Sequence, residues 1–371
     1  MQKVLIVNNN LDMGGIQKSL VNLLKGVNDD NEYTLLLFSK TCALLKDMPN
    51  DIKVITPNTI YQLLGLSREQ LKKKPIYYFL KVLLVYICKI VGKRNAIRLM
   101  GLFQKKIKGY DTVISYSHLT SASSFSNGCA EFVLDKTEAK NKICFLHCDY
   151  EHSGTCSDTN SKTYAEFDKI ACCSESVKER FLRCSLVSPD KVFVQRNFFD
   201  DDIYISSVKN PVAYDKEYIN MLIVARLSFE KGIDRALSAL ADSQRQDIII
   251  HILGDGPEKS NLIQILNHRR LANNVVFHGE QSNPYRFMIN ADYLLVPSRH
   301  EAAPIVFDEA KVLGLPVIST NTTSAYEMLD DRSLISNDLQ EILKRIQKNK
   351  GKIILKVDNK LQLQQWHLLL D

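Results

Sequence analysis

The sequence predicts an α/β protein of two doubly wound domains, each built on a parallel sheet. The chain has 371 residues, which is more than one ordinary domain holds and enough for two domains with cores of their own. Short apolar runs alternate with helical patterns in two separate series, as parallel strands joined by crossover helices do. A polar stretch at 200–218 separates the two series and is typical of a linker.

Apolar runs in the first series predict its strands, and Gly14 and Gly15 form the turn before the first helix. The predicted strands are residues 4–7, 32–38, 53–55, 112–116, 142–146, 169–173 and 192–194, with helices at 16–24 and from 175 to about 184. The N-terminal run is too short for a secretory signal and runs straight into polar residues. We therefore interpret it as a strand and expect a cytoplasmic protein.

The second series predicts a second sheet of the same kind. Its predicted strands are 221–224, 247–253, 275–277, 293–296 and 316–319, with helices at 234–241, 284–290 and 305–313. Residues 254–257 form a turn, and Pro257 opens the following helix. Residues 361–370 form an apolar tail helix that carries Trp366, and packing back on the first domain would cover it.

The expected organisation is an N-terminal acceptor-side domain at 1–205, a C-terminal donor domain at 206–350, and a tail at 351–371 that returns to the first domain. Ligands of open parallel sheets bind beyond the carboxyl ends of the strands. We therefore predict that the two domains face one another across a ligand-binding cleft.

The positive charge is concentrated in one segment. The chain has a net charge of +6, but residues 68–108, here called the basic segment, hold twelve Lys or Arg and one acid. Residues 76–91 within it are apolar at 14 of 16 positions, which is too short and too interrupted for a membrane span. The pattern favours a helix lying on an anionic bilayer, and the alternative is a buried helix with solvated basic neighbours. No nucleic-acid motif is present, so no nucleic-acid partner is expected.

Nine cysteines all lie at or before Cys184, and their odd number favours reduced thiols over a disulfide framework. Cysteines and histidines gather at residues 144–156, but no C-x-x-C pair is present and the spacing matches no common zinc site. The D-x-D at 200–202 falls in the predicted linker. We therefore expect no metal.

Two glutamates follow the strand that ends at residue 296. Glu301 lies in the loop after it, and Glu309 lies about one turn into a helix that begins near residue 304 or 305. A helix start holds phosphate through its exposed N–H groups, and carboxylates accept hydrogen bonds from sugar and ribose hydroxyls. This loop and helix can therefore grip sugar, phosphate and ribose together. The alternative is a pair of surface acids beside a buried helix.

Two cations follow the strand at 221–224, at the end of the strand where a nucleotide diphosphate would lie. Arg226 offers bidentate contacts to phosphate and Lys231 a point charge, so together they can stabilise a leaving diphosphate. The alternative is a solvated loop. In the first domain, Gly14 and Gly15 let the backbone approach an anion. They form neither a dinucleotide fingerprint nor a P-loop, so a dehydrogenase is the least favoured function.

These motifs resemble those of the family 4 glycosyltransferases, which are retaining enzymes of the GT-B fold. The resemblance rests first on Arg226 and Lys231 followed by Glu301 and Glu309. The other similar segments are 14–20, 173–176, the surroundings of Asn197, 254–257, 276–279 and 291–298. The resemblance covers most of the chain and is weaker between residues 40 and 110. Within this family, the chain resembles the bacterial enzymes of capsule and exopolysaccharide assembly.

The resemblance implies roles for the donor-side residues. Arg226 and Lys231 would hold the donor diphosphate. Glu301 would contact the hydroxyls of the donor sugar, and Glu309 would bind the ribose. Departures from the family pattern bear on the identity of the donor, because Ala302 stands where the family usually has glycine and Gln17 where many relatives have an acid.

Further roles are implied around the diphosphate. The backbone N–H groups of Ala302 and Ala303 would lie near the phosphate, and Gly14 and Gly15 would shape the pocket from the first domain. His147 stands where the family has an active-site histidine near the sugar. The alternative for His147 is a histidine that simply follows the end of a strand.

The implied reaction transfers a sugar from a nucleotide sugar, in our prediction a UDP-sugar, to a lipid-linked saccharide with retention of configuration. The leaving diphosphate assists front-face attack, so no protein nucleophile, cofactor or metal is expected. The basic segment would bind the cytoplasmic leaflet of a bacterial membrane during surface polysaccharide assembly. One alternative is a GT-B nucleotide-sugar epimerase, which has no reason for a basic membrane face. The other is a non-catalytic nucleotide-binding partner, for which Ala302 is the best support.

Overall fold

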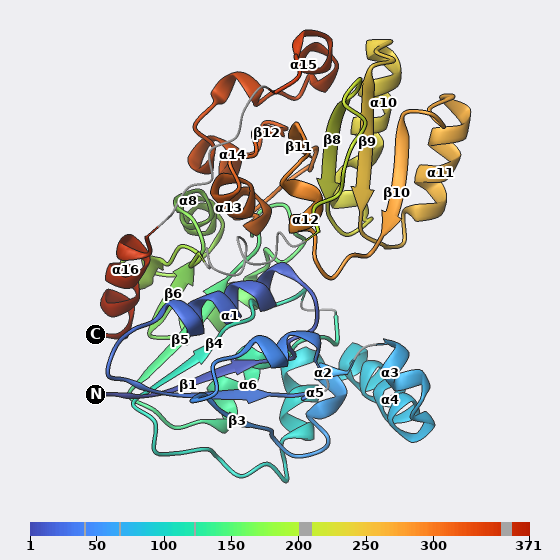
Figure 1. Cartoon of the computed structure of the whole chain (residues 1–371). Coiled ribbons are helices and arrows are strands. Elements are labelled where there is room, and N and C mark those ends of the chain that lie inside the picture. The colour runs from blue at the N-terminus through green and yellow to red at the C-terminus, as the bar shows by residue number, and fades with distance from the viewer. Residues whose placement is uncertain (41, 67, 122–123, 200–209, 350–357) are drawn as a thin grey trace. The chain divides into compact units, whose positions relative to one another are not determined.

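The computed structural model describes residues 1–40, 42–66, 68–121, 124–199, 210–349 and 358–371. The chain divides into two compact units, which Figure 1 colours along the chain. Unit 1 is Met1–Phe198 with Asn359–Asp371, and unit 2 is Phe199–Asp358. The domain limits predicted at residues 205 and 350, and the D-x-D at 200–202, lie outside the described residues.

Unit 1 is built on a seven-stranded parallel sheet in the order β3-β2-β1-β4-β5-β6-β7. Its strands are β1 (Lys3–Asn8), β2 (Glu32–Leu37), β3 (Lys53–Ile55), β4 (Thr112–Ser115), β5 (Asn141–Leu146), β6 (Lys169–Cys172) and β7 (Val192–Val194). After their first residues, β1 and β2 are buried at every position. Strands buried on both faces read as continuous apolar runs, which is why these runs were visible in the sequence.

Helices cover this sheet and connect its strands. They are α1 (Gly15–Gly26), α2 (Gln62–Gly65), α3 (Arg68–Lys72), α4 (Pro75–Val91), α5 (Lys93–Met100), α6 (Cys129–Lys136), α7 (Asp158–Ala165) and α8 (Glu175–Cys184), with short 3₁₀ turns at Ala43–Asp47 and Pro189–Lys191. Ser174 caps α8, because its side chain accepts a hydrogen bond from the backbone N–H of Val177.

The C-terminal helix α16 (Lys360–Leu370) belongs to unit 1, as predicted. Trp366 is fully buried in the core of this unit, and its indole N–H donates to the Tyr33 hydroxyl at 2.9 Å. The amine of Lys169, on β6, donates to the carbonyl groups of Leu368 and Leu369 at the end of the helix. The apolar tail is therefore covered by the first unit.

Unit 2 has a five-stranded parallel sheet in the order β10-β9-β8-β11-β12. Its strands are β8 (Ile219–Val224), β9 (Ile248–Leu253), β10 (Val275–Gly279), β11 (Tyr293–Val296) and β12 (Val317–Ser319). Its helices are α10 (Ile233–Ser243), α11 (Lys259–His268), α12 (Tyr285–Met288), α13 (Ile305–Val312), α14 (Thr323–Met328) and α15 (Leu339–Arg345), with 3₁₀ turns η3 (Phe229–Lys231) and η4 (Arg332–Leu334). The register between β8 and β9 pairs Ile219 with Ile248 and Val224 with Leu253.

One helix begins later than predicted. Pro257 was expected to open it, but α11 begins at Lys259, with Glu258 before it. The backbone N–H of Glu258 donates to the carbonyl of Leu227 at 3.0 Å, so the turn is fastened to the loop after β8. This contact holds residues 254–258 as a connection, and the helical hydrogen bonds start after it.

The apolar helix α4 is neither a membrane span nor a core helix. No helix in the described part of the chain is long and apolar enough to cross a membrane. Only Cys88 of α4 is buried, whereas Ile76, Phe79 and Ile90 are each about 70% exposed. Figure 1 shows α3 and α4 together at the margin of unit 1. The alternative of a buried helix is therefore wrong for this chain.

Candidate functional site

The predicted donor residues lie where the chain order of each sheet reverses. In unit 2, β8 neighbours both β9 and β11, so the sheet is built outward in two directions from this point. Such a switch point leaves a crevice at the carboxyl ends of the two strands, and ligands bind there. Lys231 follows β8 and Glu301 follows β11, so the two residues share this end of the sheet.

Gly232 allows the two loops to approach one another. Its φ is +61°, and a Cβ built on it would meet the carbonyl oxygen of Pro297 at 2.2 Å. Any other residue would therefore suffer both backbone strain and a collision with the main chain. The alternative of a solvated loop does not explain this close contact, whereas a fixed position for Lys231 does.

Arg299 fastens the same two loops together. Its guanidinium makes a bidentate ion pair with Asp234, at 2.9 and 2.7 Å, and lies 3.9 Å from the ring centre of Phe229. Its backbone N–H donates to the carbonyl of Glu230 at 2.9 Å. The bidentate geometry lowers the pKa of Asp234 and raises that of Arg299, because each charge stabilises the other. Arg299 thus links the loop that carries Lys231 to the loop that carries Glu301.

Lys231 and Glu301 form an ion pair at this position. The amine of Lys231 lies 2.7 Å from Oε1 of Glu301, and the hydroxyl of Ser298 donates to the same oxygen at 2.7 Å. The Glu301 side chain is 10% exposed and that of Lys231 29% exposed. Oε2 of Glu301 receives no hydrogen bond from any residue that the structure describes. The pair offers an incoming ligand a cation and an available carboxylate oxygen side by side.

Arg226 follows β8 directly and has an exposed side chain. Its guanidinium forms no ion pair with the residues that the structure describes, unlike Arg299 and Lys231. A solvated guanidinium at a strand end is available to an anionic group of a ligand.

Glu309 lies in α13, as predicted, but its carboxylate is 2% exposed. The hydroxyl of Tyr285 donates to its Oε1 at 3.0 Å. Ala302 and Ala303 lie in the loop before α13 and are partly buried. The alternative that Glu309 is a surface acid is therefore wrong, because the side chain is part of the interior beside α12.

In unit 1 the switch point lies between β1 and β4, and Gly14 and Gly15 follow β1. A Cβ on Gly15 would meet no atom within 4 Å, and one on Gly14 would meet mainly the flexible end of Gln17. The φ of Gly14, 173°, is extended backbone that any residue can adopt. Packing within the chain therefore does not require glycine at these two positions, and close approach by a ligand would explain it.

His147 follows β5 in unit 1. Its ring stacks on Phe145, with centres 5.3 Å apart, and lies 4.8 Å from the ring of Tyr116. Burial, and secondarily the nearby His118, lowers the pKa of His147 to about 3, so the imidazole is neutral at pH 7. Its Nε2 is buried and has no hydrogen-bond partner in the described structure.

Several residues of the site were not predicted from the sequence. Arg299, Asp234 and Tyr285 act on the predicted residues through contacts between segments 24 to 65 positions apart. The sequence did contain one indication of these contacts, because a third cation, Arg299, stands two positions before Glu301.

The structure also bears on metal binding. Within the described ranges, no three His, Cys, Asp or Glu side chains are placed to hold a metal ion.

Comparison with known proteins finds a family model that matches most of the second unit. The family model described as Glycosyl transferases group 1 matches residues 207–349. The O-antigen biosynthesis glycosyltransferase WclY of Escherichia coli is 36% identical over 110 residues, which are 30% of this chain and 31% of WclY. The lipopolysaccharide glucosyltransferase WaaG of E. coli K12 is 34% identical over 140 residues, or 36% of this chain and 35% of WaaG. The matched segments thus span about a third of these relatives.

Solved structures show the fold of the whole chain. HepE of Anabaena, in a complex with UDP and glucose, has a TM-score of 0.63 at 18% identity over 93% of this chain and 89% of HepE. The glycosyltransferase WaaG has a TM-score of 0.52 at 16% identity, over 92% of this chain and 90% of WaaG. The prediction of two parallel-sheet α/β units of the GT-B type is confirmed, and the predicted cleft between them stays a prediction.

Proposed function

We propose that this chain, which carries a group 1 glycosyltransferase domain, transfers a sugar from a nucleotide sugar to a saccharide acceptor in the assembly of a bacterial surface polysaccharide. The observation that carries the proposal is the pairing of Lys231 with Glu301 at the switch point of the unit 2 sheet. The names of WclY and WaaG support the setting in polysaccharide assembly.

In the proposed donor complex, Lys231 and Arg226 bind the diphosphate and neutralise the charge that develops on it. Glu301 turns Oε2 toward the sugar and accepts a hydrogen bond from a hydroxyl group. Glu309 binds the ribose, and the loop of Ala302 and Ala303 lies at the phosphate. UDP is the proposed nucleotide, and the complexes of HepE with UDP and with UDP-glucose support this choice.

The reaction we propose proceeds with retention, as the resemblance to family 4 implies. The bond between the sugar C1 and the diphosphate oxygen breaks, and the diphosphate leaves with the electron pair. The acceptor hydroxyl attacks C1 from the same face, and its proton passes to the departing diphosphate oxygen. His147, being neutral, donates or accepts a hydrogen bond at the sugar without adding charge. This scheme uses no protein nucleophile, cofactor or metal.

We further propose a lipid-linked acceptor and a peripheral position on the cytoplasmic face of the membrane. The exposed apolar side chains of α4 support this, because an apolar helix face of this size on a protein surface usually meets another apolar phase. Lysines at 72–74, which directly precede the helix in the sequence, supply positive charge near it.

The basic segment contributes less free charge than its composition suggests. Lys93 is buried and paired with Glu131, Arg94 with Glu166, Arg98 with Asp135, and Lys108 with Glu138. These four cations are neutralised within the chain, so attraction to anionic lipid falls to the remaining lysines. Membrane binding would then depend more on apolar contact than on charge.

The test is sugar transfer from a panel of UDP-, GDP- and ADP-sugars to a short-chain lipid-linked saccharide, comparing wild type with Glu309→Ala. Transfer from one donor, lost in the variant, with the new linkage in the anomeric configuration of the donor, is the expected result. Conversion of the donor without any acceptor would indicate the epimerase instead. Nucleotide binding without transfer to any acceptor would indicate the non-catalytic partner.

A further inference from the structure

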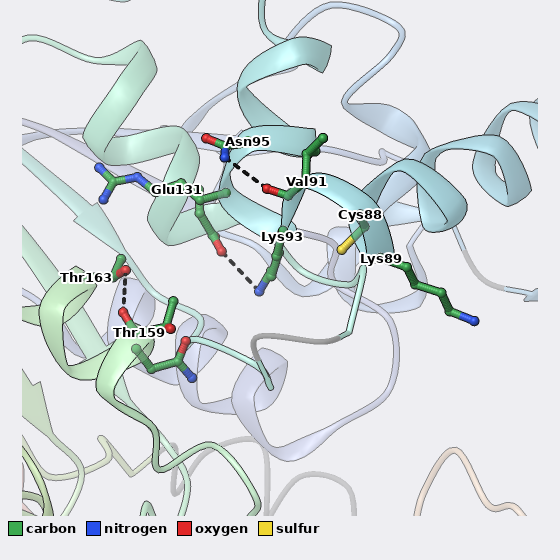
Figure 2. Close-up of a pocket in the computed structure, with 11 residues that line it drawn as sticks. Cys88, Lys89, Val91, Lys93, Asn95, Glu131, Thr159 and Thr163 are labelled. Atoms are coloured by element: carbon green, nitrogen blue, oxygen red, sulfur yellow. Dashed lines mark hydrogen bonds and ion pairs between the residues drawn. The ribbon is translucent and has the colours of Figure 1, made fainter.

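A pocket of about 570 Å³ opens in unit 1 at the junction of α4 and α5, and its lining includes none of the residues assigned to the donor. This volume lies in the range of small-molecule sites, roughly 300–1,000 Å³. Figure 2 shows the lining side chains. They are Cys88, Lys89, Val91, Gly92, Lys93, Arg94, Asn95, Glu131, Thr159, Asn160 and Thr163.

The pocket contains a buried ion pair. The amine of Lys93 lies 3.1 Å from Oε1 of Glu131, and the two side chains are 6% and 4% exposed. Lys93 also donates to the hydroxyl of Thr120 at 2.9 Å. Taking two charges out of water is costly, and an apolar pair of similar size would fill the space more cheaply. A buried pair that faces a pocket therefore points to a use for its polar atoms.

One atom of this pair is left without a partner. Oε2 of Glu131 is buried and accepts no hydrogen bond from the described residues. Buried carboxylate oxygens in native structures are nearly always hydrogen-bonded to protein or water, so this oxygen is an available acceptor for a donor group in the pocket. A hydroxyl group is such a donor, whereas a phosphate at neutral pH offers few protons and would be repelled by the carboxylate.

The opposite side of the pocket also matches hydroxyl groups. Thr159 and Thr163, on α7, lie across from Lys93 and Glu131 in Figure 2. Asn160 uses its amide N–H groups on the carbonyls of Thr120 and Thr155, at 3.1 and 2.8 Å, which leaves its oxygen as an acceptor. The lining thus holds both donor and acceptor groups, although the Thr163 hydroxyl already donates to the carbonyl of Thr159, and Val91 and Gly92 add an apolar portion. This mixture fits the hydroxyls and the C–H face of a sugar ring.

We propose that this pocket is a saccharide-binding subsite in which Glu131, Lys93 and Thr159 hydrogen-bond to the hydroxyls of a sugar residue. Its lining includes the last turn of α4, the helix with the exposed apolar face. Resting on the proposed function, the sugar is assigned to the lipid-linked acceptor, whose lipid would lie along α4. The binding of a sugar in the pocket does not itself depend on that assignment.

The test is saturation-transfer NMR titration of the full chain with glucose, galactose or N-acetylglucosamine, one at a time and without nucleotide. At least one sugar should bind the wild type. Thr159 is exposed, and its replacement by Val is nearly isosteric. Thr159→Val should weaken the affinity for that sugar roughly fivefold, which is the effect of losing one neutral hydrogen bond. The double variant Lys93→Met with Glu131→Gln, which leaves no unpaired charge, should abolish binding if its thermal unfolding stays cooperative.

One control separates this site from the rest of the surface. Thr59→Val, also exposed in unit 1 but outside the pocket, should bind as the wild type does. Absence of binding by all three sugars in the wild type, or equal binding in the wild type and Thr159→Val, would overturn the proposal. Displacement of the sugar by inorganic phosphate would also contradict it. Sugar binding that persists in a chain without any transfer activity would leave this inference standing while the proposed function fails.

Discussion

Lys231 and Glu301 satisfy one another in the structure, and a donor would have to share both. A diphosphate draws the amine of Lys231 toward its own oxygens, while Ser298 still donates to Glu301. The carboxylate is therefore not left unpaired when the amine turns to phosphate. Separate effects on nucleotide and sugar are expected from the two residues.

Replacing Glu301 with Gln tests this separation. The change keeps the size of the side chain but removes the charge that orients the sugar, so we expect kcat/KM for transfer to fall about 100-fold. Affinity for the free nucleoside diphosphate should not fall, because that ligand lacks the sugar and the change removes a carboxylate that competes for Lys231. Steady-state kinetics and calorimetry measure the two quantities. Glu341→Gln, on an exposed position of α15, is the control and should change neither.

The pKa of His251, on β9, carries a prediction about stability. Burial, and secondarily His278, lowers this pKa to about 4. Its Nε2–H donates to Asn220, whose amide donates elsewhere, so Nδ1 accepts from the N–H of His278 at 3.0 Å. Protonation of Nδ1 would place two N–H groups against one another.

Because the unfolded chain takes up this proton near pH 6.5 and the folded chain only near pH 4, stability is lost as the pH falls through that window. Lowering the pH from 7 to 5 should reduce the free energy of unfolding of both proteins. We expect the reduction to be about 2 kcal/mol smaller in His251→Gln than in the wild type. Urea denaturation at the two pH values measures it. His268→Gln, exposed at the end of α11, should behave as the wild type does, and a pH dependence unchanged in His251→Gln would refute the assignment.

At the scale of elements, α4 has well-defined N- and C-terminal ends and an exposed apolar surface. Pro75 stands at its first position, and Gly92, with a φ of +82°, ends it before α5. The helix packs against α3 and α5 and leaves most of its large side chains in solvent. Its stability thus comes from one side, while the other side is available to a membrane.

Phe79→Ser tests this role of α4. Phe79 is 69% exposed, so the change should cost little folding free energy but remove apolar area from the proposed membrane face. Co-sedimentation with anionic vesicles should show binding weakened by about tenfold. Leu186→Ser, a 74% exposed leucine outside α4, is the matched control. Equal vesicle binding by Phe79→Ser and the wild type would argue against α4 as the contact.

The return of α16 to unit 1 can be tested in the same way. Trp366→Ala removes a fully buried ring and its hydrogen bond to Tyr33, so we expect the free energy of unfolding to fall by about 3–5 kcal/mol. Leu368→Ala, at a 59% exposed position of the same helix, should change it by less than about 0.5 kcal/mol. Chemical denaturation followed by tryptophan-independent far-UV circular dichroism measures both. Similar values for the two variants would contradict the packing of α16.

At the scale of the whole molecule, two sheets are each built outward from a central pair of strands, β1 with β4 and β8 with β11. The sequence was sufficient to predict these strands because they are buried on both faces and read as uninterrupted apolar runs. It also placed Lys231 and Glu301 after the correct strands. Their position directly after apolar runs, together with the resemblance to family 4, carried that information.

Contacts between distant segments could not be predicted in this way. The dependence of Gly232 on Pro297, and of Arg299 on Asp234, arises only when β8 and β11 become neighbours. For the same reason the basic segment appeared more cationic than it is, since Lys93 finds Glu131 on a different helix. The side-chain pattern of one segment does not reveal the charges that its neighbours supply.

The most direct measurement of the central claim is calorimetric titration of the wild type, Lys231→Met and Arg269→Met with UDP, GDP and ADP. We predict that the wild type binds one of these nucleotides. Lys231→Met should bind it about 10- to 100-fold more weakly, because the variant loses one charged hydrogen bond. Arg269→Met, which changes an exposed arginine on the same unit, should bind it as the wild type does. No binding of any of the three nucleotides, or equal affinity in Lys231→Met and the wild type, would contradict the assignment of the donor site to unit 2.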